Sequence, residues 1–216
     1  MVGSIDNDST KKQLFEAAKR LFSSQGFDGT TVKEIADSAG VNISLVSYHF
    51  GGKEGIYRAC IEEFGKLRLG AAQKLLEPAS SVEELRVRLE LFVEEFILLF
   101  LEDPEACKII HNEVERHMDL VEDIFRGTFL KVFGALADYF VKAQKAGLID
   151  SNLEPPLVAG LFFGSMVHLA RMDSINEKFF GNSLKNPKYR SKFVKHLAKM
   201  CLYGVAKEAD KKGKQR

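Results

Sequence analysis

The segment between Thr31 and Lys53 carries the side chains in this chain that are best suited to bind phosphates and bases. Lysine supplies positive charge, and tyrosine, histidine, serine and asparagine supply hydrogen-bond donors and acceptors. Such groups contact the phosphates and base edges of nucleic acids, and an exposed apolar side chain can contact a thymine methyl group. The candidate contacts are Thr31, Lys33, Asn42, Ile43, Ser44, Leu45, Ser47, Tyr48, His49 and Lys53.

The same segment is typical of two short helices joined by a tight turn. Thr31 and Glu34, three residues apart, predict a capping box at the start of the first helix. Gly40 ends that helix at a sharp turn, and Asn42 is placed to cap the second helix. Gly51-Gly52 breaks the second helix before a longer one begins. This layout is a helix-turn-helix, whose second helix fits a DNA major groove.

Three positions illustrate how the candidate residues would act. Lys33, in the first turn of the first short helix, reaches a phosphate or a guanine edge, and the alternative is a solvated surface lysine. Ile43 lies opposite the packing side of the second helix, so it fits a thymine methyl group; the alternative is a plain surface residue. Lys53 stands at the N-terminus of the long helix, where its ammonium and the helix dipole both attract an anion.

Two runs in this segment resemble the DNA-binding half of the TetR family, the tetracycline-repressor-like regulators. One extends from Tyr48 to Tyr57 and reads YHFGGKEGIY, and an upstream amphipathic helix that ends in Phe22 and Gly26-Phe27 fits the same pattern. The other run matches at Thr30, Thr31, Ile35, Ala36, Ala39, Gly40 and Val41. The resemblance covers about the first quarter of the chain.

The resemblance implies roles for residues and for the rest of the chain. It implies that Tyr48 and His49 contact phosphates, whereas Ser47 departs from an aromatic residue that many members carry. It also implies that the C-terminal helices bind a small-molecule effector and form a homodimer. We therefore expect a dimeric repressor that leaves double-stranded DNA when the effector binds. A regulator that responds to a partner protein instead is the alternative.

Composition places the chain among ordinary globular proteins and gives the DNA prediction little help. The 216 residues are 45% hydrophobic and 28% charged, and the net charge is only +1, so the expected DNA binding rests on the placement of residues. Three widely spaced cysteines, Cys60, Cys107 and Cys201, favour buried reduced thiols over disulfides or zinc ligands. The first residues are not typical of a signal peptide, and the apolar run 157–170 is too short to cross a membrane, so we expect a cytoplasmic protein without membrane contact.

Helical periodicity predicts an all-α fold, with an N-terminal three-helix helix-turn-helix domain and a larger C-terminal helical domain. We expect the DNA-binding domain at 1–52, the effector-binding and dimerisation domain at 53–208, and a charged tail at 209–216. Thr10 and Gln13 suggest a second capping box, and a polar loop is expected after residue 172. The expected helices cover 10–25, 53–77, 81–101, 104–117, 119–145, 156–172 and 187–208, besides the two short ones.

Aromatic residues in the C-terminal part allow two interpretations. A cavity lined by phenylalanine with a few polar groups would bind an apolar or aromatic effector, and a plain hydrophobic core is the alternative. The candidate effector-binding residues are Phe92, Phe96, His111, Glu115, Phe125, Phe129 and His168. His111 and Glu115 share a helical face but His117 lies well round the helix, so the pattern predicts no metal site, and we expect no cofactor.

Two helices near the C-terminus predict the dimer interface. Gly160 and Gly164, one turn apart, allow another helix to approach closely. Apolar residues at helical spacing would complete a four-helix interface between two copies, or else the core of one copy. These residues are Leu157, Leu161, Val167, Phe193, Leu197 and Val205. A two-fold dimer predicts a pseudo-palindromic DNA site. The rival interpretation is a helical enzyme, but no nucleophile, paired-acid or nucleotide-loop signature supports it.

Overall fold

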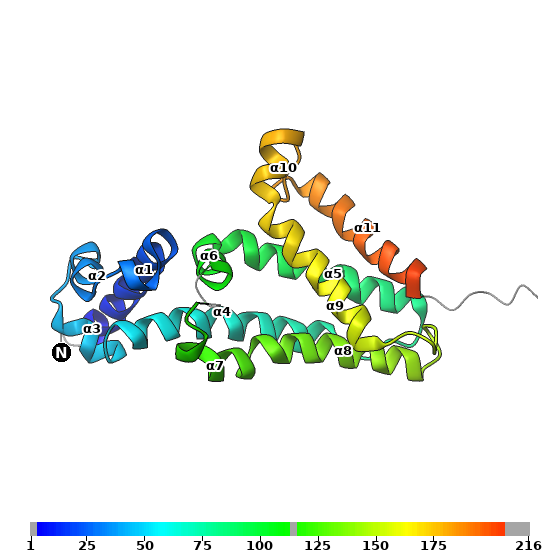
Figure 1. Ribbon diagram of the computed structural model, residues 1–216, viewed down its shortest axis with the longest axis horizontal. Coiled ribbons are helices and arrows are strands. Elements are labelled where there is room, and N and C mark those ends of the chain that lie inside the picture. Colours follow the sequence, from blue (N-terminus) through cyan, green and yellow to red (C-terminus); the bar gives the residue numbers. More distant parts are fainter. Residues whose placement is uncertain (1–3, 113–115, 206–216) are drawn as a thin grey trace, which may run out of the picture. The chain divides into compact units, whose positions relative to one another are not determined.

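The computed structural model of the chain describes residues 4–112 and 116–205, which contain eleven helices and no strand (Figure 1). The all-α class is thereby confirmed. The helices are α1 Ser4–Gly29, α2 Val32–Ala39, α3 Ser44–Phe50, α4 Lys53–Leu75, α5 Val82–Glu102, α6 Pro104–Asn112, α7 Met118–Gly127, α8 Phe129–Lys145, α9 Pro155–Arg171, α10 Asp173–Phe180 and α11 Pro187–Val205. No helix within the described ranges is long and apolar enough to cross a membrane.

The helices form two compact units. The first consists of the described parts of Met1–Leu67 and Asp103–Phe129, and the second of the described parts of Arg68–Glu102 and Leu130–Arg216. Helix α4 contributes its first part to one unit and its last part to the other. The functional division expected at residue 52 stays a prediction, and the expected tail at 209–216 lies outside the described residues.

The first unit surrounds one hydrophobic cluster. Helix α1 contributes Leu14 and Phe22, and the ring of Phe22 meets that of Tyr57 edge to face at 5.2 Å between centroids. The cluster also includes Ile109 of α6 and Val121 of α7, so these helices complete the core beneath the helix-turn-helix. The other buried members are Ala17, Ala18, Ile35, Ala36, Val46, Ile56, Cys60, Ile61 and Ile124.

Helix α1 begins earlier than the sequence pattern predicts. Because it starts at Ser4, Thr10 lies inside the helix, and the expected capping box of Thr10 and Gln13 is wrong. An N-cap residue needs a non-helical backbone, which Thr10 does not have. The helical geometry is interrupted at Gly26, whose φ of 75° and ψ of 175° are accessible to glycine but costly for other residues.

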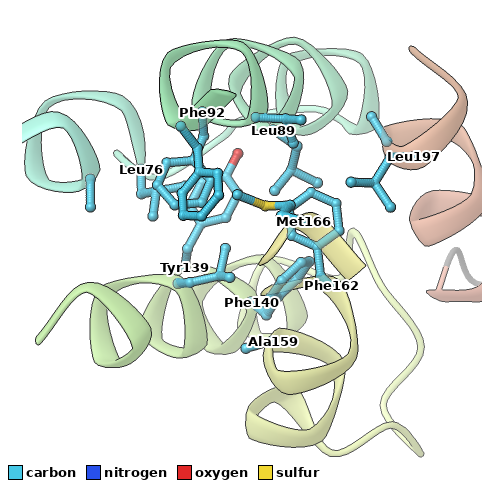
Figure 2. Close-up of a cluster of buried hydrophobic side chains, with 14 of the residues drawn as sticks. Leu76, Leu89, Phe92, Tyr139, Phe140, Ala159, Phe162, Met166 and Leu197 are labelled. Carbon is cyan, nitrogen blue, oxygen red and sulfur yellow. The ribbon is translucent and has the colours of Figure 1, made fainter. Parts of the chain in front are cut away.

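The second unit packs α5, α8, α9 and α11 around the larger cluster, part of which is shown in Figure 2. Phe140 of α8 meets Phe162 of α9 at 6.2 Å between ring centroids, and the Tyr139 hydroxyl donates to the carbonyl of Leu85 at 3.4 Å. Leu197 of α11 is buried in this core, which agrees with the alternative that it completes the core of one copy. Helical periodicity predicted an apolar stripe on α11 but not which neighbour the stripe faces.

Two helix boundaries differ from the sequence prediction. The expected helix 119–145 is two helices, α7 and α8, separated at Thr128, whose φ of −127° and ψ of −74° are not helical. A glycine at 127 followed by the β-branched Thr128 weakens a helix, so this pair was the sequence signal for the break between α7 and α8. The expected polar loop after residue 172 contains α10, which ends at Gly181 with a left-handed φ of 68°.

Helix α10 is fixed by a buried carboxylate. The Asp173 carboxylate accepts hydrogen bonds from the Ser183 hydroxyl at 2.9 Å and from the Leu184 backbone N–H at 2.6 Å. Asp173 and Ser183 are both buried, so these bonds replace the water that the carboxylate would otherwise bind. The bonds close the loop after α10 onto the start of that helix. An acidic residue in the first turn and a glycine after the last turn were sequence signals for this helix.

The three cysteines form no disulfide. Cys60 and Cys107 are buried and Cys201 is half-buried. Burial raises the pKa of the Cys60 thiol, and it raises the pKa of the Cys201 thiol to about 12. Since the thiolate is the reactive form, both thiols are poorly suited to redox chemistry.

Candidate nucleic-acid interface

The start and end of α2 follow from its own sequence. The Thr31 side chain accepts a hydrogen bond from the Glu34 N–H at 3.2 Å, and the Glu34 carboxylate accepts one from the Thr31 N–H at 2.8 Å. This confirms the expected capping box. The Thr31 hydroxyl also donates to the Glu34 carboxylate at 2.7 Å, and this bond, followed by that of the Thr31 N–H, holds the pKa of Glu34 below its ordinary value. At the other end, Gly40 adopts a left-handed φ of 68° and its N–H returns to the carbonyls of Ala36 and Asp37.

Asn42 holds the start of α3. Its side-chain oxygen accepts hydrogen bonds from the Ser44 backbone N–H at 2.9 Å and from the Ser44 hydroxyl at 2.8 Å. Ile43 already has helical backbone angles, so this contact satisfies an N–H group in the first turn, as the sequence predicted for Asn42. The carboxamide oxygen is engaged within the chain, and the amide NH2 group is the part that can donate to a base.

One side of α3 is buried and the other is exposed. Val46 is fully buried in the cluster that includes Ile35 and Ala36, whereas Ile43 and Tyr48 are 49% and 72% exposed. Leu45 is half-buried and packs against this cluster, so core packing explains why an apolar side chain stands at this position. We define the recognition surface as the exposed residues Asn42, Ile43, Ser44, Ser47 and Tyr48.

Thr31 and Lys33 present a second exposed edge at the start of α2. Lys53, at the start of α4, is half-buried, and its Nζ lies 4.3 Å from the centroid of the Phe27 ring. This cation–π contact orients the ammonium group of Lys53 against the surface of the first unit.

His49 is the most unusual polar group of the segment. The ring is half-buried and meets the Tyr48 ring edge to face at 4.9 Å between centroids. The His49 Nε2 atom is buried and has no hydrogen-bond partner among the described residues. Because buried ring nitrogens are normally paired, His49 Nε2 is a group that a ligand could satisfy.

The candidate effector residues do not line one cavity. Phe92 and Phe96 line a cavity of about 10 Å³ in the second unit. Phe125 and Phe129 belong to the first unit, where their rings stack at 5.3 Å between centroids and pack against its core. His168 is exposed on α9, and His111 lies half-buried on α6. Glu115 lies outside the described residues.

Arg68, a buried residue of α4 that lines the same cavity, is not among the residues that the sequence pattern predicts for a site. Its guanidinium carbon lies 4.1 Å from the centroid of the Phe96 ring. A buried arginine carries no local sequence signal, since its burial depends on α5 and α8. Among the described residues, no group of three or more histidine, cysteine, aspartate or glutamate side chains could hold a metal ion.

Comparison with known proteins agrees with this geometry. Residues 14–60 match the family model described as "Bacterial regulatory proteins, tetR family". The probable HTH-type transcriptional regulator YttP of Bacillus subtilis is 31% identical over 57% of this chain, and the match spans 59% of YttP. The HTH-type transcriptional regulator RutR of Escherichia coli is 25% identical over 90% of both chains.

The fold itself is found in solved structures. The ketosteroid transcriptional regulator KstR2 of Mycobacterium tuberculosis superposes with a TM-score of 0.71 at 18% identity, covering 96% of this chain and 98% of that one. Helix-turn-helix geometry, the matched family model and relatives along most of the chain therefore agree. The N-terminal part of the chain, residues 14–60, therefore matches the TetR family of bacterial regulatory proteins, and the chain is similar along most of its length to an HTH-type transcriptional regulator.

Proposed function

We propose that this chain is a dimeric repressor, which binds a pseudo-palindromic site in double-stranded DNA and is released by a small apolar or aromatic effector. The observation that carries the DNA-binding part is the recognition surface on α3. Its residues are exposed while Val46, on the opposite side, is fully buried. A rigidly packed helix with one exposed side of small polar and apolar residues fits a major groove.

The residues divide into those that would read bases and those that would contact phosphates. Ile43 suits a thymine methyl group, and the hydroxyls of Ser44 and Ser47 can donate to or accept from either kind of base edge. Lys33 and Tyr48, both exposed, suit phosphate oxygens. The phosphate contacts give affinity, and the base contacts give sequence preference.

His49 has a specific place in this proposal. If the His49 ring turns so that its buried Nε2 reaches the surface, this atom would donate to a phosphate oxygen when the ring carries a proton there, which supplies the partner that the described residues do not. Lys53, held against Phe27, would direct its ammonium to a phosphate at the N-terminus of α4.

Apolar residues on α9 and α11 support a dimer. Leu157 and Leu161 of α9 are 61% and 69% exposed, and Met200 and Tyr203 of α11 are 74% and 76% exposed. Helices α9 and α11 contact each other within the second unit, so these residues belong to one helix pair. A second copy of this pair would bury them in a two-fold, four-helix interface. Two recognition helices would then lie on successive turns of DNA.

The effector would bind in the second unit and act on the first. The KstR2 neighbour is described as a ketosteroid regulator, and ketosteroids are largely apolar molecules. The cavity beside Phe92 and Phe96 holds about one water-sized group, so an effector must widen it. An effector that favours the widened arrangement would shift the population away from the one that matches DNA, with α4 as the helix shared by both units.

Selection from a pool of random DNA duplexes, by the purified protein at near-physiological salt, tests the proposal. Enrichment of a pseudo-palindrome, bound by two copies of the chain, is the expected result. Enrichment of a single half-site by a monomer would contradict the dimer. Absence of enrichment by a folded, dimeric protein stripped of copurified ligands by denaturation and refolding would overturn the proposed DNA binding.

A further inference from the structure

Helix α11, whose place in the second unit is shown in Figure 1, has an apolar side and a basic side. The apolar side contributes four buried residues to the core of this unit: Val194, Leu197, Ala198 and Leu202. The basic side carries four exposed lysines: Lys188, Lys192, Lys195 and Lys199. Because an α-helix turns by about 100° per residue, these four positions lie within about 60° of one another around the helix axis. We call them the lysine stripe.

Positive charge is concentrated around this stripe. From Lys178 to Lys199 the sequence contains seven basic residues and no acidic residue. The whole chain, in contrast, has 31 basic and 30 acidic residues, so the remainder of the chain is net negative. The nearly neutral composition therefore conceals one strongly basic segment outside the helix-turn-helix.

The stripe differs from the neighbouring cations in what it contacts. Arg190 donates to the Glu94 carboxylate at 2.6 Å, and Lys185 pairs with Glu177 at 3.3 Å. No lysine of the stripe forms an ion pair with a carboxylate among the described residues. Like charges one turn apart on a helix destabilise it. The stripe therefore costs some stability in the chain alone, and a bound polyanion would offset this cost.

The structure argues against a protein or a membrane as the partner of the stripe. Lysine is depleted in protein–protein interfaces, which are built around an apolar centre that the four lysines do not provide. A helix that binds a membrane surface inserts its apolar side into the lipid. The apolar side of α11 is instead buried in the core of the second unit, so it cannot insert.

Double-stranded DNA has the charge distribution that fits the stripe. Eleven residues separate Lys188 from Lys199, so the stripe is about 16 Å long. A duplex carries one negative charge for about every 1.7 Å of its axis, and therefore presents many phosphates over that length. An ammonium group on a flexible stem binds a phosphate as a point charge and does not require a fixed geometry.

We propose that the lysine stripe binds the phosphate backbone of double-stranded DNA without reading its sequence, as a contact additional to the recognition surface on α3. This inference goes beyond the repressor function proposed above, because it depends neither on an effector nor on a dimer. Phosphate contacts of this kind release counterions, so they make DNA affinity dependent on salt. The slope of log K against log salt is accordingly the quantity that reports the stripe.

Two double variants of the full chain test the proposal. Lys192→Gln/Lys195→Gln removes two charges from the stripe, and Lys142→Gln/Lys145→Gln removes two charges from exposed lysines of α8 in the same unit. Affinity for a labelled duplex of scrambled sequence is measured by fluorescence anisotropy at several salt concentrations. The slope should decrease by about 0.9 for each lost phosphate contact, hence by about 1.8 per copy in the α11 variant, and remain unchanged in the α8 variant.

Equal slopes for the wild type and the α11 variant would overturn the proposal. An equal decrease in the α8 variant would do the same, since the effect would then follow net charge and not position. Repetition with A·T-rich and G·C-rich duplexes tests the independence from sequence, and a changed base preference in the α11 variant would contradict it. An unchanged slope together with lost binding to phosphatidylserine–phosphatidylcholine vesicles would assign the stripe to a membrane instead.

A charge-retaining variant separates charge from structure. Lys192→Arg/Lys195→Arg should keep the wild-type slope, and loss of the slope in this variant would show that the effect is structural. Sedimentation equilibrium should give all variants the oligomeric state of the wild type, so that the slopes are compared between equal assemblies.

Failure of the stripe and failure of the repressor function give different results. If the random pool yields no enriched sequence but the α11 variant still lowers the slope, the stripe stands and the proposed repressor function fails. If the pool yields a pseudo-palindrome and the α11 variant keeps the wild-type slope, the repressor function stands and the stripe is refuted.

Discussion

Arg58 of α4 forms a two-pronged ion pair with Asp123 of α7. The Arg58 Nη1 donates to Asp123 Oδ1 at 3.0 Å and Nη2 donates to Oδ2 at 2.6 Å, and Arg58 also donates to the carbonyl of Leu120. The guanidinium hydrogen bonds lower the pKa of the Asp123 carboxyl. The pair joins α7 to the start of α4. Arg58 lies five residues after Lys53, which is the last of the candidate DNA contacts.

Asp123→Asn should weaken the ion pair with Arg58, while the side chain keeps nearly the same size and shape. The melting temperature should fall only slightly, because the Asp123 side chain is 69% exposed and solvent screens the pair. A double-mutant cycle with Arg58→Met, measured by urea unfolding, should give a favourable coupling that decreases in 1 M salt. Additive effects of the two substitutions at low salt would show that the contact contributes nothing.

Gly65→Ala tests the close approach of α4 to the break between α7 and α8. A methyl group at Gly65 would lie 2.4 Å from Thr128 Oγ1 and 2.8 Å from Thr128 Cβ. We expect the free energy of unfolding to fall by about 1–3 kcal/mol, the usual cost of overpacking. Gly70→Ala, on the same helix but with open space around the added methyl, should raise it by roughly 0.5–1 kcal/mol. A stabilised Gly65→Ala protein in urea unfolding would refute this account of the break.

Glu84→Gln tests the start of α5 through its pH dependence. The Ser80 hydroxyl and backbone N–H both donate to the Glu84 carboxylate, and Arg88 pairs with it at 3.0 Å. These contacts lower the pKa of Glu84 from 4.5 to about 2. A lowered folded-state pKa stabilises the protein above the unfolded pKa, and this stabilisation disappears as the pH falls toward 2.

The wild-type protein should therefore lose its stability advantage over Glu84→Gln between about pH 4.5 and 2. Above that range the difference should be constant. The measurement is chemical unfolding at a series of pH values. If the difference in unfolding free energy between the two proteins does not change with pH, the carboxylate charge of Glu84 does not stabilise the start of α5.

Local features were predictable from sequence, and features that depend on distant residues were not. The capping box of Thr31 and Glu34 and the turn at Gly40 involve residues at most four positions apart. Both features can therefore be predicted from a short stretch of sequence. The burial of Leu197 and the exposure of Met200 depend on where α11 meets α5, which periodicity does not specify.

The candidate sites show the same contrast. Exposure of Ile43 and burial of Val46 followed from the spacing of apolar residues on one short helix. Arg68 was missed because an arginine in a helix is normally exposed, and only the packing of α5 and α8 around it makes it part of a cavity. Likewise, Phe125 and Phe92 belong to different units although both fit an aromatic stripe.

Leu161→Asp tests the proposed dimer. Leu161 is 69% exposed on α9, so a charge there should leave the fold intact but be desolvated if two copies meet. Because a two-fold interface contains the substitution twice, the dimer dissociation constant should rise by roughly 100-fold or more. The measurement is sedimentation equilibrium. Leu130→Asp, at an exposed leucine of α8, is the control and should stay dimeric. Equal behaviour of the two variants would place the interface elsewhere.

Lys33→Ala and Ser47→Ala separate affinity from sequence preference at the recognition surface and the adjacent edge of α2. If the exposed Lys33 contacts one phosphate, its removal should weaken binding to all duplexes and reduce the slope of log K against log salt by about 0.9. If Ser47 faces a base edge, its removal should leave the slope unchanged and alter preference at one position in each half-site. Titrations of the selected operator and its single-base variants, at several salt concentrations, measure both quantities. An unchanged slope for Lys33→Ala would remove that residue from the interface, and a uniform loss across operator variants for Ser47→Ala would assign Ser47 to the DNA backbone instead.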